Sequence, residues 1–294
     1  IVVDNQHGTN HPRRLGFYRA DKAVQRLAEG GALGDHFKHR RLFIAEQLRL
    51  TPRQEQFQQV RQWSVQTQGR QNAFRDAYQN PSHLLTMTSW HDDISITARG
   101  TVSTSTPPQG RVSDGTGLSP LIFINETRLT CADDAIRALA ASCRPPQHFR
   151  TEHALQLAKA IEAAVSYQPG STEVSSTAAE VLQQGQGVCQ DHTHVYLACC
   201  HALEIPARYV SGYLDPETGE TAQTHAWVDV WVEDHDYAGW ISLDVTHTRL
   251  MNSSYCRLAI GRDYDSASPV RGVRRGGGSE QLEVQVSVAH FDGQ

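Results

Sequence analysis

A thiol, an imidazole and a carboxylate follow one another in the second half of the chain, at Cys189, His225 and Asp244. A thiol becomes a good nucleophile at neutral pH when a base takes its proton, and that base needs a third group to hold its tautomer. The three residues are therefore a complete set of groups for nucleophilic acyl transfer, in which sulfur attacks an amide carbonyl.

The sequence around Cys189 suggests how the thiol is activated. Gly187 allows a tight loop, and the apolar pattern that follows predicts a helix from Cys189 to about Leu203. A helix N-terminus carries a partial positive charge and unpaired N–H groups. These groups stabilise a thiolate and can donate to the oxyanion of a tetrahedral intermediate, so the backbone N–H of Cys189 is a candidate oxyanion donor.

The segment that holds His225 and Asp244 predicts an antiparallel hairpin. Two strand-like runs, residues 225–233 and 239–245, are joined by a short polar turn. His225 begins the first run and Asp244 lies at the end of the second, so pairing brings the two side chains within hydrogen-bonding reach. Trp227 shares the face of His225, where we expect it to pack rather than to contact substrate.

The chain divides by composition into four parts. Residues 1–41 form a peripheral N-terminal extension with one helix at about 18–29. Residues 42–106 hold short alternating runs between turn residues, which predicts an antiparallel β-domain. Residues 107–120 are rich in Pro, Gly and Ser and indicate a linker. Residues 121–294 form the catalytic domain.

The catalytic domain is expected to begin with helices and end with strands, which is typical of an α+β fold. Besides the helix that starts at Cys189, we expect helices at 132–141, which follows Thr130, at 152–165 and at 178–182. The expected strands are 207–214, 225–233, 239–245, 257–264 and 282–289.

Composition restricts the possible partners and compartment. The 294 residues are 39% hydrophobic with a formal net charge of −5 and no long Lys/Arg run, so we expect a globular protein that does not bind nucleic acid. Arg271, Arg274 and Arg275 form a short basic patch, expected to be a solvated turn. No stretch reaches the roughly 20 apolar residues of a membrane helix, and we expect no membrane partner.

The cysteines favour a reducing compartment. The six are scattered and two are adjacent, which is a poor disulfide framework for a chain of this length. With no signal peptide visible, we expect a cytoplasmic protein. Apart from Cys189, the cysteines are expected to be buried core residues, namely Cys131, Cys143, Cys199, Cys200 and Cys256.

Four segments together closely resemble the bacterial transglutaminase-like family, which is related to cysteine proteases. They are Gly187–His194 (GVCQDHTH), Leu203–Tyr213 (LEIPARYVSGY), His225–Val228 (HAWV) and Trp240–Thr246 (WISLDVT). Residues 42–106, including Leu48–Arg53 and Phe74–Tyr78, resemble the β-rich N-terminal domain that often precedes this core.

The resemblance implies a papain-like transglutaminase core, with helices packed on an antiparallel sheet, preceded by the small antiparallel β-domain. It implies that Cys189 is the nucleophile, that His225 is general base and then general acid, and that Asp244 orients His225. It also implies a side-chain oxyanion donor upstream of Cys189, for which Gln183, Gln184 and Gln186 stay open. Asp191 matches a family position too, and we expect it to bond N–H groups in the first helical turn.

A metal site is the first alternative to a catalytic thiol. Cys189, His192, His194, Cys199 and His201 lie close in sequence. Zinc sites usually show paired ligands at short spacing with a distant second pair, and that pattern is missing. No calcium loop of the Asp-x-Asp-x-Asp-Gly type is present either. We therefore expect no metal and no other cofactor.

The remaining alternatives concern the reaction itself. A non-catalytic peptide-binding module is possible for this fold, but all three catalytic groups are present. After sulfur attacks an amide, water resolves the thioester in a cysteine peptidase or amidase, and an amine resolves it in a transglutaminase. We expect hydrolysis of a peptide or protein substrate, with the amine acceptor as the alternative. The sequence leaves the identity of the substrate and the oligomeric state open.

Overall fold

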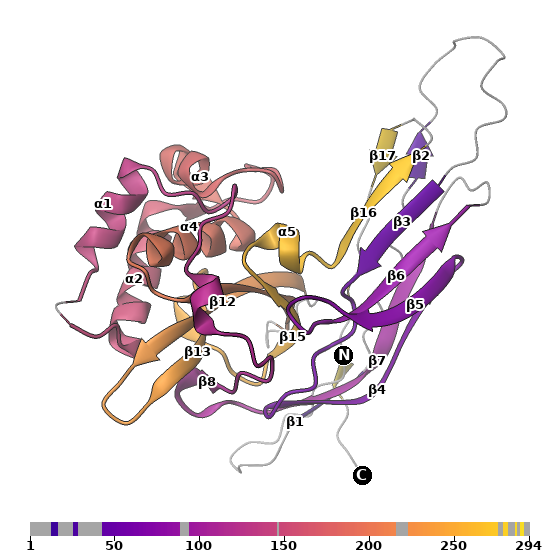
Figure 1. The fold of residues 1–294 in the computed structure, drawn as a ribbon, viewed down its shortest axis with the longest axis horizontal. Helices are drawn as coiled ribbons and strands as arrows, with labels where there is room; N and C mark the ends of the chain where they lie inside the picture. Colours follow the sequence, from indigo (N-terminus) through magenta and orange to yellow (C-terminus); the bar gives the residue numbers. More distant parts are fainter. Residues whose placement is uncertain are drawn as a thin grey trace, which may run out of the picture.

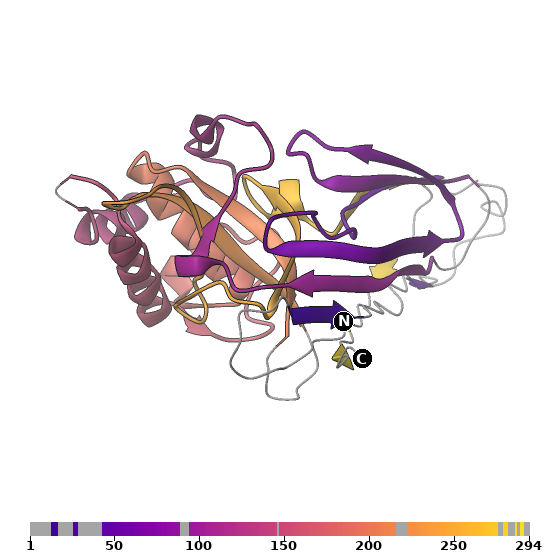
Figure 2. The ribbon, with the colours of Figure 1, turned by 90° about the horizontal axis from the view of Figure 1, so that it is seen from below.

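The computed structural model describes residues 13–16, 26–28, 43–88, 94–145, 147–215, 223–275, 279–281, 286 and 289–290. Helices gather around one sheet at one end of the molecule, and a group of longer strands forms the other end (Figure 1). The turned view of Figure 2 shows the same division between a helical end and a β-rich end.

The sheet of the helical part contains both long and short strands. Its order is β14-β13-β12-β11-β15, β8 pairs with β13, and all of these pairs are antiparallel. The strands are β8 (Arg111–Val112), β11 (Ala207–Leu214), β12 (Gln223–Glu233), β13 (Ala238–Asp244), β14 (Arg249–Leu250) and β15 (Tyr255–Gly261).

The helix that begins at Cys189 lies at the centre of the helical part. The helices are α1 (Asp134–Ser142), α2 (Thr151–Ala164), α3 (Ala178–Gln184), α4 (Cys189–Ala202) and α5 (Tyr264–Ala267). Helix α4 packs against α1, α2 and α3 and against β11 and β12. Its residues 191–201 are all buried, as expected for a helix covered on every side. The core around α4 therefore fixes where the helix begins.

The β-rich part is built from two antiparallel four-stranded sheets, in the orders β18-β1-β7-β4 and β16-β3-β6-β5. Their strands are β1 (Arg13–Gly16), β3 (Phe43–Leu48), β4 (Gln58–Thr67), β5 (Arg70–Arg75), β6 (Pro81–Met87), β7 (Ile96–Thr104), β16 (Val270–Arg275) and β18 (Ala289–His290). A separate pair joins β2 (Arg26–Ala28) and β17 (Ser279–Gln281).

Two features join the β-rich part to the helical part. Strand β16 follows α5 and pairs with β3 along its whole length. Buried Arg257 of β15 donates to Asp229 at 2.7 and 2.8 Å and forms an ion pair with Glu55 at 2.7 Å. Gln58 of β4 both donates to and accepts from the backbone of Arg257. The β-rich part is therefore attached to the sheet that carries His225.

The expected fold class is confirmed: helices precede an antiparallel sheet, and a β-rich region comes before them. Three details are wrong. Arg271, Arg274 and Arg275 belong to strand β16 rather than to a turn, because they pair with β3. Residues 26–28 are a strand where a helix was expected. Cys131 is exposed instead of buried.

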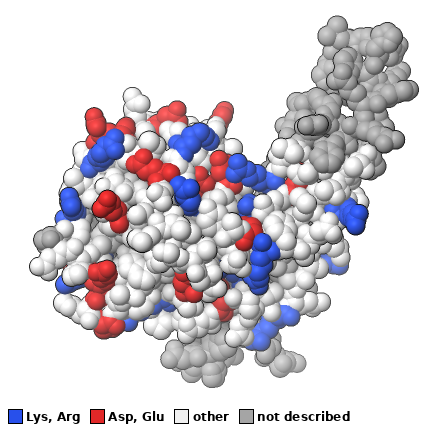
Figure 3. Space-filling model, in the orientation of Figure 1, with Lys and Arg blue, Asp and Glu red and all other residues white. Residues whose placement is uncertain are grey.

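Some expectations fall outside the described residues. They are most of the extension at 1–41, including most of its helix, and most of the strand expected at 282–289. No helix in the described part of the chain is long and apolar enough to cross a membrane. On the face drawn in Figure 3, acidic and basic side chains are interspersed.

Candidate active site

The chain is held tightly just before Cys189. Strand β10 (Gln186–Gly187) pairs in parallel with β9 (Ser166–Tyr167). Asp191 Oδ2 accepts hydrogen bonds from the Val188 backbone N–H at 2.7 Å and from the Thr172 hydroxyl at 2.6 Å. Asp191 thus bonds the N–H of Val188, the residue before the helix, rather than an N–H within the first turn as expected, and this bond fixes the N-terminus of α4.

The side chain of Asp191 approaches the backbone at position 187 so closely that this residue must be a glycine. A Cβ at this position would lie 2.7 Å from Asp191 Cβ and 2.9 Å from Asp191 Oδ2. Asp191 could then keep its bond to Val188 only if the loop moved. The glycine and the carboxylate therefore act together to place Cys189, which is partly exposed at the first position of α4.

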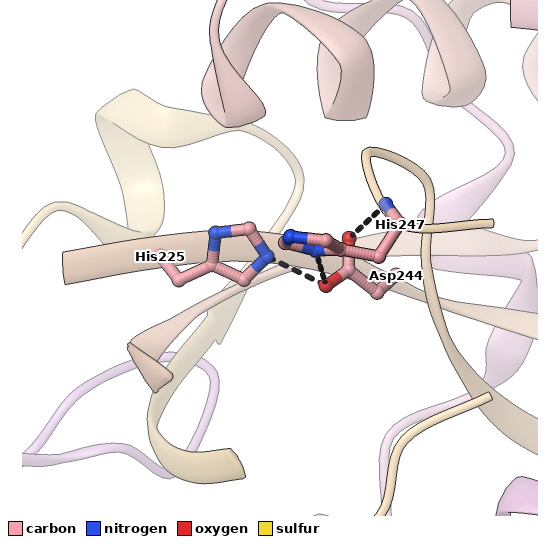
Figure 4. A group of neighbouring side chains, drawn as sticks. All are labelled: His225, Asp244 and His247. Atoms are coloured by element: carbon pink, nitrogen blue, oxygen red, sulfur yellow. Dashed lines mark hydrogen bonds and ion pairs between the residues drawn. The ribbon is translucent and has the colours of Figure 1, made fainter. Parts of the chain in front are cut away.

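His225 and Asp244 are in direct contact, as the hairpin predicts. His225 Nε2 donates to Asp244 Oδ2 at 2.7 Å, from β12 to β13 (Figure 4). Both side chains are buried. This bond occupies Nε2 and leaves Nδ1 for a second partner.

That second partner is Cys189. Burial alone would lower the pKa of His225, but its hydrogen bonds with Asp244 and Cys189 and their negative charges raise it to about 10. The ring is therefore protonated at neutral pH, and an imidazolium beside the sulfur stabilises a thiolate. The three residues singled out in the sequence are brought together in the order thiol, imidazole, carboxylate.

Asp244 accepts further hydrogen bonds besides that of His225. The Tyr255 hydroxyl and His247 Nδ1 each donate to Oδ2 at 2.7 Å, and the His247 backbone N–H donates to Oδ1 at 3.1 Å. Burial alone would raise the pKa of Asp244, but the bonds from His225 and His247 hold it well below its usual range. Asp244 is therefore an ionised acceptor at neutral pH.

The imidazole plane is fixed by aromatic neighbours. The Trp227 ring stacks on His225 with centroids 6.0 Å apart, and Tyr255 lies at 6.2 Å. Trp227 is completely buried and its indole N–H donates to Ser242 Oγ at 2.9 Å. Trp227 thus packs against the His225 ring. Because Trp227 is completely buried, it has no surface that a substrate could contact.

Three residues of the site were missed by sequence reasoning. Tyr255 lies on a strand with no motif, and only the order of strands within the sheet brings it to Asp244. His247 could have been noticed, because it follows Asp244 by three residues. Tyr167 pairs with Gly187 and is half exposed. Burial, and to a smaller extent the charge of Cys189, raise the pKa of Tyr167.

The glutamines considered as oxyanion donors lie at the surface. Gln183, Gln184 and Gln186 are exposed, and Gln184 Nε2 donates to the Ser171 carbonyl at 3.0 Å. Tyr167, which pairs with Gly187 and is half exposed, is another candidate for the role.

The residues of the alternative metal cluster do not converge. His192 bonds Thr246 Oγ1 and the Val165 carbonyl, and His194 Nε2 accepts from the Tyr264 N–H. His201 lies beside the Ala207 carbonyl. Burial raises the pKa of Cys199 to about 12, so this thiol is protonated. Each group has its own place in the core, and a shared ion is not supported there.

Two family models match the chain. The transglutaminase-like superfamily model matches residues 137–245, and the model of the bacterial transglutaminase-like N-terminal region matches residues 38–103. An uncharacterized protein of Mycobacterium tuberculosis is 32% identical over 245 residues, which are 74% of this chain and 77% of the relative. An uncharacterized protein of Mycobacterium leprae is 35% identical over 133 residues, 43% of this chain and 46% of the relative.

One solved structure matches along almost the whole chain. It is that of a candidate cysteine protease from Cytophaga hutchinsonii, with a TM-score of 0.70 and 20% sequence identity. The match covers 96% of this chain and 93% of that chain. At this identity the likeness concerns the fold.

Proposed function

Because the chain belongs to the transglutaminase-like superfamily, we propose that it is a cysteine peptidase or amidase that forms a thioester on Cys189 and hydrolyses it. The observation that supports this most directly is the hydrogen-bonded series Cys189, His225 and Asp244, in which Cys189 lies at the N-terminus of a buried helix. The substrate is a peptide or protein amide, since that is the bond this set of groups can cleave.

The first half of the reaction uses the proton held by His225. The Cys189 thiolate attacks the amide carbonyl carbon, and a tetrahedral oxyanion forms. His225 then gives its Nδ1 proton to the leaving nitrogen, the C–N bond breaks, and the amine departs. Asp244 keeps the imidazole oriented through Nε2 and stabilises the imidazolium.

The second half regenerates the thiol. Water attacks the thioester while His225 takes up one of its protons at Nδ1. The C–S bond breaks, the carboxylic acid leaves, and the thiolate–imidazolium pair is restored. In both halves the oxyanion would be met by the backbone N–H of Cys189 and the phenol of Tyr167, which lies on the strand beside Gly187.

Intact-mass analysis of the protein mixed with a peptide library tests the proposal. Wild-type protein is expected to gain the mass of an acyl group on Cys189 and to release a shortened acid, whereas Cys189→Ala gains nothing. Cys131→Ser is the matched control, because Cys131 is the other cysteine with an exposed side chain.

The same experiment with an added primary amine identifies the acceptor. A product carrying the amine, formed faster than the acid, would contradict hydrolysis and make the protein a transglutaminase. Retention of peptides by both wild type and Cys189→Ala, with no acyl adduct, would indicate a binding module instead.

A further inference from the structure

His247 performs no chemical step in the proposed acyl transfer, yet it bonds the same carboxylate as the general base. It lies in the turn that follows β13, and its side chain is 45% exposed. His247 Nδ1 and His225 Nε2 are each 2.7 Å from Asp244 Oδ2 (Figure 4). Two imidazoles thus converge on one carboxylate oxygen, one from the buried side and one from solvent.

This arrangement has the composition of a transition-metal site. Nε2 of His225, an Asp244 carboxylate oxygen and a ring nitrogen of His247 all lie within 4.8 Å of one another. Zinc binds imidazole nitrogen and carboxylate oxygen at about 2.0–2.2 Å, and three protein ligands plus water are a common set. Both ring nitrogens now lie 2.7 Å from Asp244 Oδ2, so the side chains must move apart to admit an ion between them.

We propose that His225, Asp244 and His247 bind a zinc-type divalent ion, with solvent as the fourth ligand, and that the bound ion reversibly inhibits the enzyme. The exposed side of His247 gives the ion a route to the site. Tyr255 donates to Asp244, and Trp227 stacks on His225, so two of the three ligands are already oriented by neighbours. Such outer contacts strengthen metal sites.

The inhibition follows from which ring nitrogen is used, and this part rests on the proposed function. Binding of the metal ion displaces the Nε2 proton of His225 to solvent, and the lone pair of Nε2 then bonds the ion while the remaining ring proton stays on Nδ1. The ring then has no free lone pair to accept a proton from water attacking the thioester. Asp244, which then binds the ion, no longer orients the imidazole of His225 through a hydrogen bond. Cys189 faces Nδ1 and is not a ligand.

Calorimetric titration of the full-length protein with ZnCl₂, in a non-thiol reductant, tests the site without any substrate. One tight equivalent is expected for wild type and for Cys189→Ala. His247→Ala is expected to weaken binding by more than about tenfold. His148→Ala is the matched control, since His148 is an exposed histidine paired with Glu233 at 2.5 Å, and its affinity should equal that of wild type.

Equal zinc affinity in wild type and His247→Ala would overturn the proposal, as would loss of the site in Cys189→Ala, which would assign the ion to the thiol. Substitution with Co²⁺ gives a second readout: a spectrum without a thiolate charge-transfer band supports the His/Asp set, and its presence refutes it.

Peptide turnover supplies the last measurement. Zinc should inhibit wild type at concentrations more than about tenfold below those needed for His247→Ala, each compared with its own zinc-free rate. Binding without inhibition would refute the inhibitory role. Absence of turnover in all forms would count against the acyl-transfer function, and the calorimetry would still decide on the site.

Discussion

Asp244 is held by residues from three places in the chain: His225 on β12, Tyr255 at the start of β15 and His247 in the turn after β13. A buried carboxylate needs such partners, because each unmet acceptor position costs free energy. The His225–Asp244 contact could be predicted, since strand alternation and a short turn bring hairpin ends together. The contact with Tyr255 could not, because it depends on the order of strands in the sheet.

Replacing Tyr255 with Phe should lower kcat/KM by roughly tenfold, because a hydrogen bond to a charged group contributes about 1.5–3 kcal/mol. Steady-state kinetics on an identified peptide substrate measures this. Tyr196→Phe is the control: Tyr196 is also buried, and its hydroxyl donates to the Ala154 carbonyl at 3.2 Å. It should cost stability and leave kcat/KM within about twofold. Equal kinetics in the two variants would show that Tyr255 does not position Asp244.

Iodoacetamide should alkylate Cys189 before the other five cysteines at pH 7. Burial raises the pKa of Cys199 and of Cys256 to about 12, and it raises that of Cys200 well above its usual range. A hydrogen bond with Glu126 raises the pKa of the exposed Cys131. These thiols are therefore protonated, whereas Cys189 is hydrogen-bonded to His225, the base that activates it in the proposed mechanism.

Peptide mapping by mass spectrometry after brief exposure measures the order of alkylation. Cys131→Ser should not change the rate at Cys189, and His225→Ala should slow it. Faster alkylation of Cys131 than of Cys189 in wild type would contradict the activation of Cys189.

The elements around Cys189 could be predicted more fully than their fine geometry. Helix α4 begins at Cys189 as expected, because Gly187 ends the preceding segment and an apolar run follows. The N-cap of α1 is Asp133, whose carboxylate accepts from the Ile136 N–H at 2.8 Å, and not the Thr130 that precedes the expected helix. Strands β9 and β10 were not expected, since two-residue strands have no periodicity to detect.

Gly187→Ala should slow acyl-enzyme formation by roughly 10- to 100-fold, because a small displacement of a nucleophile has a large effect on rate. The added Cβ would lie 2.7 Å from Asp191 Cβ, so Asp191 must move and release the loop before Cys189. Gly115→Ala is the control, as its Cβ would meet no atom within 4 Å. Stopped-flow measurement of thioester formation compares the two, and matching rates would show that the close approach is not needed.

At the scale of the whole molecule, the division into helical and β-rich parts follows from the sequence, but their attachment does not. Arg257 and Glu55 form a buried ion pair between the two parts. Neither residue lies in a pattern that predicts a partner so distant in sequence. Buried His194 and His201 likewise are ordinary core residues that the sequence alone does not separate from metal ligands.

These two histidines should make stability fall as the pH is lowered from 7 to 5. Burial lowers the pKa of each to about 4, while the value in an unfolded chain is about 6.5. Between these values the unfolded chain binds protons that the folded chain does not, so the free energy of unfolding decreases with falling pH. At pH 5 the expected loss is on the order of 2 kcal/mol per histidine.

Urea unfolding at pH 7, 6 and 5 measures this slope. His194→Gln should reduce it, since one buried imidazole is removed, and His148→Gln should leave it unchanged because His148 is exposed. A slope that is the same in all three proteins would rule out His194 as its source.

Strand β16 pairs with β3, which lies much earlier in the sequence. Next to this pair, Arg49 donates to the carbonyl of Ser268, a residue 219 positions further along the chain. A ribosome must therefore deliver residues 270–275 before the edge of β3 is covered. Until then, the nascent polypeptide exposes the edge of β3 that β16 will cover. Ordered synthesis thus leaves this sheet incomplete until residues 270–275 have been translated.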